Sequence, residues 1–182
     1  VNQTGGRKKF ADEVVSVASI FQKHGYATDI SVTETTEDVE KVFLEKGDNA
    51  DIIICGGGDG TLNLTVTAMM RAGLGIPIGY IPAGTTNDIA GSLGLPKKIP
   101  DASEIIASGD LHDMDAGLFN GSKYFVYVAS FGAFTQTSYT TTQSLKNTFG
   151  HLAYIIEGMK ELPVLKSYYV KAETDSDTFE DK

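Results

Sequence analysis

The sequence has few of the residues that several protein classes depend on. It contains one cysteine, Cys55, so no disulfide can form within the chain, and a core thiol in a reducing cytoplasm is expected. Its three histidines lie far apart and lack ligand spacing with cysteine or acidic residues, which argues against a zinc site. No apolar run approaches the roughly 20 residues that span a bilayer. We therefore expect any membrane contact to be peripheral.

Basic side chains are also scarce. The chain has 15 Lys and Arg against 24 Asp and Glu, which gives a formal net charge of −9. Nucleic-acid binding needs clustered Lys and Arg for phosphate contacts, so we expect no nucleic-acid partner. The same charge opposes permanent adhesion to an anionic membrane. With 41% hydrophobic and 21% charged residues, the composition is that of a globular chain.

Glycine, by contrast, is abundant, and residues 56–61 read Gly-Gly-Gly-Asp-Gly-Thr. They follow the apolar run 52–55 and precede a helical pattern from Leu62. A strand that ends in glycines and opens a helix directs backbone amides and the helix dipole at one point, which suits phosphate. The carboxylate of Asp59 would need Mg²⁺ or bound water to separate its charge from that of the phosphates. The spacing excludes the dinucleotide and P-loop motifs, and the alternative is a turn that serves only tight packing.

A second segment repeats this arrangement. The apolar run 76–81 leads into residues 82–88, where Gly84 is expected to make the turn and a threonine to cap the next helix. Because ligands bind at the carboxyl ends of parallel strands, both loops are expected to face one crevice, with Asp59 and Asp88 converging. The alternative for residues 87–88 is a plain helix N-terminus.

The periodicities predict an α/β fold. Helical spacing over residues 10–21 ends at Gly25, a strand follows at 26–32, and Thr35 with Asp38 has the spacing of a capping box. Strands and helices then alternate through a helix at 101–108. This order predicts a Rossmann-like, doubly wound parallel sheet forming a nucleotide-binding domain over residues 1–110.

The pattern changes near residue 111. Asn120-Gly121 predicts a two-residue hairpin turn, and residues 124–128 predict a buried central strand. Residues 168–172 alternate as a last strand with no further partner, which would leave an exposed edge. We therefore expect residues 111–182 to begin an antiparallel β-rich domain that is truncated, and a first strand to be missing before Val1.

The segments Gly-Gly-Gly-Asp-Gly-Thr-Leu-Asn and Ile-Pro-Ala-Gly-Thr-Thr-Asn-Asp-Ile-Ala resemble the paired signature of the diacylglycerol kinase catalytic domain. Bacterial diacylglycerol kinases, related lipid kinases and sphingosine kinases share it. Residues 139–163, with Gly-His-Leu-Ala-Tyr at 150–154, are similar to the soluble bacterial diacylglycerol kinases of Gram-positive organisms. The resemblance implies transfer of the ATP γ-phosphoryl group to the hydroxyl of diacylglycerol, giving phosphatidic acid, or of a similar lipid. It also implies Mg²⁺, a cytoplasmic enzyme peripheral to the inner face of the membrane, and a homodimer.

Carried over residue by residue, the resemblance implies an N-terminal ATP loop, a threonine near the nucleotide and two phosphate loops. These positions are Asn2, Gln3, Thr4, Gly5, Gly6, Thr33, Gly57, Gly58, Asp59, Gly60, Thr61, Asn63, Gly84, Thr85 and Asn87. Gln3 stands where the family usually has proline. For a network of Mg²⁺ and water the implied residues are Asp59, Asp88 and Asp115. The resemblance places the general base in a missing C-terminal part.

One residue departs from the family pattern. Leu64 stands where a glutamate usually follows the Asn of the first loop, so the polar contacts of that glutamate are absent. A rival enzyme class is NAD kinase, which shares Gly-Gly-Asp-Gly-Thr but lacks the pattern seen at residues 84–90. A rival outside the enzymes is a non-catalytic module that binds nucleotide or lipid, which Leu64 favours.

Overall fold

The computed structural model describes residues 8–33, 35–119, 121–129, 168–173 and 177–181. The chain forms two compact units, residues 1–128 and 129–182. The hairpin that follows residue 110 belongs to the first unit, whereas the sequence placed a domain boundary at 110/111. The elements of the first unit are α1 (Lys8–Lys23), α2 (Thr36–Lys46), the 3₁₀ turn η1 (Gly47–Asn49), β1 (Ile53–Gly57), α3 (Asp59–Ala72), β2 (Ile78–Pro82), α4 (Asp88–Ser92), α5 (Ile99–Ser108), β3 (Gly117–Phe119) and β4 (Lys123–Phe125).

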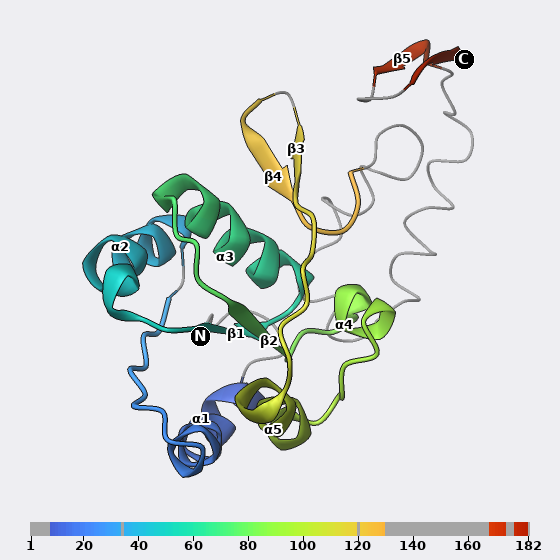
Figure 1. Ribbon diagram of the computed structural model, residues 1–182. Helices are drawn as coiled ribbons and strands as arrows, with labels where there is room; N and C mark the ends of the chain where they lie inside the picture. The colour runs from blue at the N-terminus through green and yellow to red at the C-terminus, as the bar shows by residue number, and fades with distance from the viewer. Residues whose placement is uncertain (1–7, 34, 120, 130–167, 174–176, 182) are drawn as a thin grey trace. The chain divides into compact units, whose positions relative to one another are not determined.

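Two parallel strands form the centre of the first unit (Figure 1). β1 pairs with β2 in a register that sets Ile54 opposite Gly79 and Gly56 opposite Ile81. Because side chains alternate along a strand, these four residues share one face of the sheet, and Ile53, Cys55 and Tyr80 share the other. Both faces are covered, which agrees with the apolar runs that predicted the strands.

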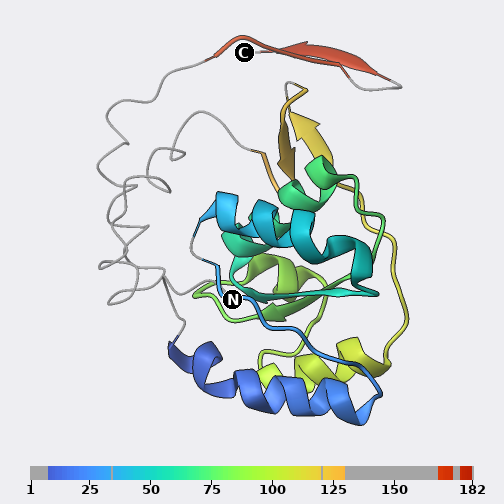
Figure 2. The same cartoon turned by 90° about the vertical axis from the view of Figure 1, so that its left-hand side faces the viewer.

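Helices α1 and α5 cover the first face (Figure 2). Phe10 of α1, Ile81 of β2 and Ile99 of α5 form one cluster of buried side chains, and Ile54 packs against it. Ile81 is fully buried. A glycine at position 79 leaves room for Ile106, since a Cβ there would lie 2.5 Å from the Ile106 side chain. The apolar stripe predicted over residues 10–21 is therefore the contact face of α1.

Helices α2 and α3 cover the opposite face. Phe43 of α2 and Met69 of α3 are buried together, with Ile53 and Ile78 of the sheet packed against them. The predicted capping box is present, because the Thr35 side chain accepts from the Asp38 backbone N–H and the Asp38 carboxylate accepts from that of Thr35. Helices on both faces of parallel strands confirm the α/β class.

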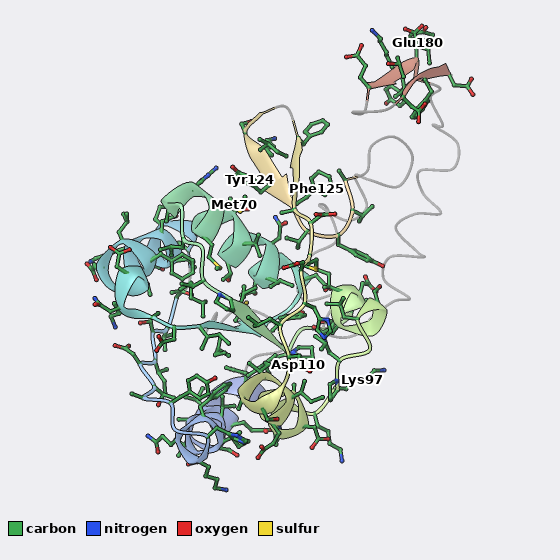
Figure 3. The ribbon with its side chains drawn as sticks, viewed as in Figure 1. Met70, Lys97, Asp110, Tyr124, Phe125 and Glu180 are labelled. Carbon is green, nitrogen blue, oxygen red and sulfur yellow. The ribbon has the colours of Figure 1, made fainter. Side chains whose placement is uncertain are left out.

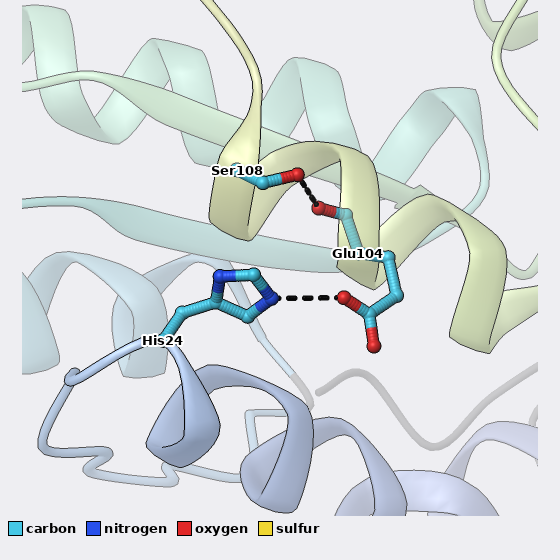
Figure 4. A network of polar contacts seen from close by, with 3 residues as sticks. All are labelled: His24, Glu104 and Ser108. Carbon is cyan, nitrogen blue, oxygen red and sulfur yellow. Dashed lines mark hydrogen bonds and ion pairs between the residues drawn. The ribbon is translucent and has the colours of Figure 1, made fainter.

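A surface contact joins the end of α1 to α5. His24 Nε2 lies 2.9 Å from Glu104 Oε2, and the Ser108 hydroxyl donates to the backbone carbonyl of Glu104 at 2.7 Å (Figure 4). Both partners of the His24 contact are partly exposed, so the free energy it contributes is small. This contact gives His24 a structural role.

The predicted strand at 26–32 is wrong. In the described structure this segment has no regular secondary structure, and Thr33, which follows it, makes only an isolated bridge. It forms one wall of an apolar groove of about 170 Å³, whose other walls are α1 and β1. A β-like sequence pattern reports an apolar face but not a hydrogen-bonded neighbour. None of the glycine-loop residues lines this groove.

The hairpin at 117–125 is confirmed, but its turn differs from the prediction. Phe119 pairs with Lys123, so three residues connect the strands, and Gly121 has a φ of 64°. Figure 3 labels Tyr124 and Phe125 on β4, which packs on α3. The predicted buried strand at 124–128 ends at Phe125, and Val128 is 66% exposed. The aromatic and apolar composition of residues 124–128 was therefore not evidence of burial.

In the second unit the described strands are β5 (Val170–Glu173) and β6 (Thr178–Asp181), which pair antiparallel. The expectation that the strand near 168–172 has no partner is therefore wrong: β6 covers its edge. The Tyr169 hydroxyl donates to Glu180, and this hydrogen bond to the neighbouring carboxylate raises the pKa of Tyr169. Across the described ranges, every helix is too short or too polar to cross a bilayer.

Candidate functional site

The two glycine loops, residues 56–61 and 82–88, lie side by side. The Ala83 N–H donates to the Gly57 carbonyl at 2.8 Å. A Cβ built on Gly84 would lie 2.5 Å from the Gly58 Cα, and one built on Gly58 would lie 3.1 Å from the Gly84 Cα. A side chain at Gly84 would therefore force one of the two backbones to move, and one at Gly58 would be tight. The two loops therefore lie together at the carboxyl ends of the strands, as the geometry of parallel strands predicts; that they face a crevice stays a prediction.

Each glycine of the triplet has a different neighbour. A Cβ on Gly56 would lie 2.2 Å from the Phe10 ring, and one on Gly57 would lie 2.6 Å from the Thr61 side chain. Gly58 faces Gly84 instead. Gly56 therefore serves tight packing, the alternative role considered for these glycines, because its lack of a side chain leaves room for Phe10 of α1. Gly57 admits the first turn of α3, and Gly58 brings the loops together.

The first loop leads directly into α3. The helix begins at Asp59, three residues before the predicted start at Leu62, and its N-cap is Gly58, which has no side chain to cap it. The first intrahelical bond runs from the Leu62 N–H to the Gly58 carbonyl at 3.0 Å. The amides of residues 59–61 therefore have no acceptor within the helix, and they carry the positive end of its dipole. Thr61 is the third residue of the helix.

Asp59 connects this loop to the second one. Its Oδ2 accepts from the Asp88 N–H and its Oδ1 from the Ile89 N–H, each at 3.1 Å. These are the first two amides of α4. A residue 29 positions earlier in the chain thus takes the place of a local N-cap. The predicted convergence of Asp59 with Asp88 is a contact between a carboxylate and a backbone amide.

Asn87 shapes the second loop. It is the N-cap of α4 but makes no side-chain capping bond, and it has left-handed backbone angles, φ 56° and ψ 52°. Its Oδ1 accepts from the Gly84 N–H at 2.8 Å, and its Nδ2 donates to the Gly84 carbonyl at 2.9 Å. The expected cap by a threonine is wrong, because Asn87 occupies the N-cap position and Asp59 caps the amides. Asparagine tolerates this backbone region better than most residues.

A buried, weakly acidic side chain lies under each loop: the Cys55 thiol under the first and the Tyr80 phenol under the second. Under the first, the Thr65 hydroxyl lies 3.3 Å from Cys55 Sγ and 2.9 Å from the Thr61 carbonyl. Burial raises the pKa of Cys55 to about 11. Under the second, the Tyr80 hydroxyl lies 3.4 Å from Asn87 Oδ1. Burial raises the pKa of Tyr80 well above its ordinary value, and the negative charge of Asp59 raises it further. Both groups stay neutral at physiological pH.

The remaining predicted residues differ in their surroundings. Asn63 Nδ2 lies 3.4 Å from the Tyr124 carbonyl on β4, so it contacts the hairpin. Thr33 is buried, while Gly60 and Thr85 are exposed. Asp88 and Asp115 are exposed too. Among the described residues, no three Asp, Glu, His or Cys side chains gather closely enough to bind a metal ion. The predicted residues Asn2, Gln3, Thr4, Gly5 and Gly6 lie outside the described ranges.

The sequence did not single out the links within the site. Tyr80 was assigned only to a buried strand, and Asn87 only to a helix start or a nucleotide contact. A partial signal for Asn87 was available, because asparagine in a loop often bonds to nearby backbone and tolerates left-handed angles. No local pattern indicates that Asp59 caps a helix 29 residues away.

Comparison with known proteins gives a consistent assignment. The model of the diacylglycerol kinase catalytic domain matches residues 1–119. A diacylglycerol kinase of Bacillus subtilis is 35% identical over 181 residues, which are 98% of this chain and 59% of the relative. One from Staphylococcus aureus is 34% identical over 98% of this chain and 57% of its own length. A crystal structure of a diacylglycerol kinase from Bacillus anthracis superposes with a TM-score of 0.70 at 20% identity, covering 99% of this chain and 58% of that one. The chain thus spans less than two thirds of these relatives.

Proposed function

Because this chain belongs to the diacylglycerol kinase catalytic domain family, we propose that it supplies the nucleotide-binding part of an ATP-dependent lipid kinase. The reaction is transfer of the γ-phosphoryl group of ATP to the hydroxyl of diacylglycerol, giving phosphatidic acid, or to that of a similar lipid. The first unit, residues 1–128, is α/β with parallel strands, and the second, β-rich domain is proposed to begin within the unit of residues 129–182. No observation in the structure favours NAD kinase.

The observation that carries this proposal is the contact between the two loops. Gly58 and Gly84 approach so closely that Gly84 admits no Cβ and Gly58 admits one only if the backbone of Gly84 yields, and the uncapped start of α3 lies beside them. Backbone amides at a helix N-terminus, reached without interference from side chains, suit the negative oxygens of phosphate. A loop that served packing alone would need Gly56 and Gly57, but not the approach of Gly58 to Gly84.

The residues fit the triphosphate of ATP, which we assign to the first loop. Gly57, Gly58, Asp59, Gly60, Thr61 and Asn63 come from this loop and the start of α3, and Gly84, Thr85 and Asn87 from the second. A Cβ at Gly60 would meet no atom within 4 Å, so this part of the first turn is open to a ligand. We also assign Thr33 and residues 2–6 to this set, as contacts to the parts of the nucleotide other than the triphosphate.

Magnesium is proposed to bind through water near Asp59, Asp88 and Asp115. When bound, the ion neutralises charge on the phosphate oxygens. Each oxygen of Asp59 already accepts one amide, and a carboxylate oxygen retains capacity for a second hydrogen bond from water. The exposed carboxylates of Asp88 and Asp115 accept from water in the same way.

Within this chain the residues bind and orient; none is assigned as general base. Amides of the first turn of α3 neutralise phosphate charge, and the rigid second loop limits the positions that the nucleotide takes. The group that accepts the hydroxyl proton is proposed to lie in the further length that the relatives possess. Leu64 supplies no polar contact where the family has glutamate, so lipid transfer here does not depend on one.

The proposed setting is the inner face of the cytoplasmic membrane. The net charge of −9 and the absence of a spanning helix in the described ranges fit a protein that meets its lipid peripherally. A homodimer is proposed by analogy with bacterial relatives.

The test is a screen of the full-length protein with labelled ATP and Mg²⁺ against diacylglycerol, sphingosine, ceramide and NAD. Label in phosphatidic acid, or in one of the other lipids, is the expected result. Label in NAD alone would replace the assignment with NAD kinase. Calorimetric binding of ATP with no labelled product would instead support the non-catalytic module that Leu64 favours.

A further inference from the structure

Asp59 has an unusual set of partners for a carboxylate in a phosphate site. Its two oxygens accept from two consecutive amides, Asp88 N–H and Ile89 N–H, each at 3.1 Å. These amides open α4, and they belong to a different loop from Asp59 itself. Each oxygen of the Asp59 carboxylate therefore accepts a hydrogen bond from the neighbouring loop.

The usual capping residue of α4 is engaged elsewhere. Asn87 occupies the N-cap but directs its amide group back to Gly84, with bonds of 2.8 and 2.9 Å. Without Asp59, the first two amides of α4 would have no side-chain acceptor among the described contacts. The short helix, only five residues long, thus depends on a residue of the first loop for its start.

The same residue begins α3. Asp59 is the first residue of that helix, directly after Gly58, so its backbone is part of the first loop while its side chain is bonded to the second. Its carboxylate lies between the start of α3 and the start of α4. Any shift of one loop is transmitted to the other through two charge-assisted hydrogen bonds.

From these contacts we propose that Asp59 is a positioning residue: its carboxylate holds the second loop directly, and it meets magnesium only through water, so it is not a ligand of the ion. It fixes the distance between the two loops by capping α4, and it acts on the nucleotide through the second loop. This inference rests on the proposed function for its effect on phosphoryl transfer. Its structural part, the cap on Asp88 and Ile89, is testable without any activity.

The experiment compares wild-type full-length protein with Asp59→Ala, Asp59→Asn and the control Asp101→Asn. Asp101 is an exposed carboxylate in the first turn of α5, so the control removes one charge at a helix start away from the loops. The first measurement is amide hydrogen exchange at residues 88 and 89. Exchange is expected to accelerate most in Asp59→Ala and less in Asp59→Asn, which retains one acceptor oxygen, and not in the control.

The second measurement is lipid kinase activity as a function of Mg²⁺ and of ATP. A small displacement of a bound group can lower kcat about 100-fold, and we expect a loss of that order in Asp59→Ala. The Mg²⁺ concentration for half-maximal activity should change less than about threefold, because no ligand of the ion is removed. Asp101→Asn should match wild type in both.

The outcomes separate this inference from the proposed function. A tenfold or greater rise in the Mg²⁺ requirement of Asp59→Asn, with unchanged exchange at residues 88 and 89, would overturn the positioning role. Wild-type protein that transfers no phosphate while its Asp59 variants still expose these amides would reject the proposed function and retain the cap. If Asp59→Ala does not fold, Asp59→Asn carries both measurements.

Discussion

The two glycine loops look alike in sequence, but their hydrogen bonds differ. In the first, the amides at the start of α3 follow a glycine N-cap that offers no side chain. In the second, the amides of Gly84, Asp88 and Ile89 all have side-chain acceptors, from Asn87 and Asp59. The amides at the start of α3 therefore lack the side-chain acceptors that these three amides of the second loop have.

This difference teaches that a repeated motif does not imply a repeated role. A phosphate gains most from amides that lack other partners, because satisfied amides must first give up a bond. We therefore assign phosphate binding chiefly to the first loop and rigidity to the second. Substitutions at the contact between the loops, in each loop alone and at the buried group beneath one of them can test this difference.

Gly84→Ala should have the largest effect, because its Cβ would lie 2.5 Å from the Gly58 Cα and neither backbone can yield without moving a loop. We expect unfolding free energy to fall by about 1–3 kcal/mol and MgATP affinity to become unmeasurable by calorimetry. The matched control is Gly91→Ala in α4, where a Cβ meets no atom within 4 Å. Wild-type affinity in Gly84→Ala would contradict the close approach of the loops.

Gly56→Ala should separate packing from binding within the first loop. The new methyl group would meet the Phe10 ring at 2.2 Å, so we expect a loss of about 1–3 kcal/mol of stability in urea titrations. MgATP affinity of the folded protein should change little. Phe10→Leu should relieve part of the clash, and a double-mutant cycle measures that coupling. Additive losses would mean that Gly56 does not serve to admit α1.

Asn87→Ala and Asn87→Gly test the second loop. Both lose the bonds to Gly84, but only alanine is strained at a φ of 56°. The free energy of unfolding of Asn87→Ala should therefore be about 1 kcal/mol lower than that of Asn87→Gly, measured by thermal and chemical denaturation. Equal stabilities would show that the left-handed conformation of Asn87 costs nothing.

Alkaline pH tests the buried thiol under the first loop. Burial raises the pKa of Cys55 from 9.0 to about 11, so its neutral form favours the folded state. This contribution is complete below pH 9.0 and is lost as pH rises toward 11. Between pH 8 and pH 10 the free energy of unfolding of the wild type, taken from denaturation curves, should fall by about 1 kcal/mol more than that of Cys55→Ala. Identical pH profiles of the two proteins would exclude the thiol as the cause.

Much of the α/β unit was predictable because its signals are local. The apolar runs gave β1 and β2, the capping box at Thr35 gave α2, and the spacing of Phe10 and Phe21 gave α1. The contact of the two loops followed from the geometry of parallel strands. The strand at 26–32 failed because its apolar side chains line a groove without pairing.

The interior of the site was harder to predict because it depends on tertiary contacts. Asp59 was placed among phosphate and metal ligands, and nothing near it in sequence indicates Ile89 as its partner. The helix starts three residues before the predicted start, with Gly58 as an N-cap that provides no side-chain bond. Likewise, the edge of β5 is covered by β6, whose polar sequence carries little strand signal.

The central claim is that the first loop binds the triphosphate while the second is already fixed. The most direct measurement is the change in backbone amide NMR shifts of the isotopically labelled full-length protein as MgATP is added. We predict large changes for residues 58–61 and small ones for Gly84, Asp88 and Ile89. Large changes confined to the second loop, with the start of α3 unmoved, would contradict the account.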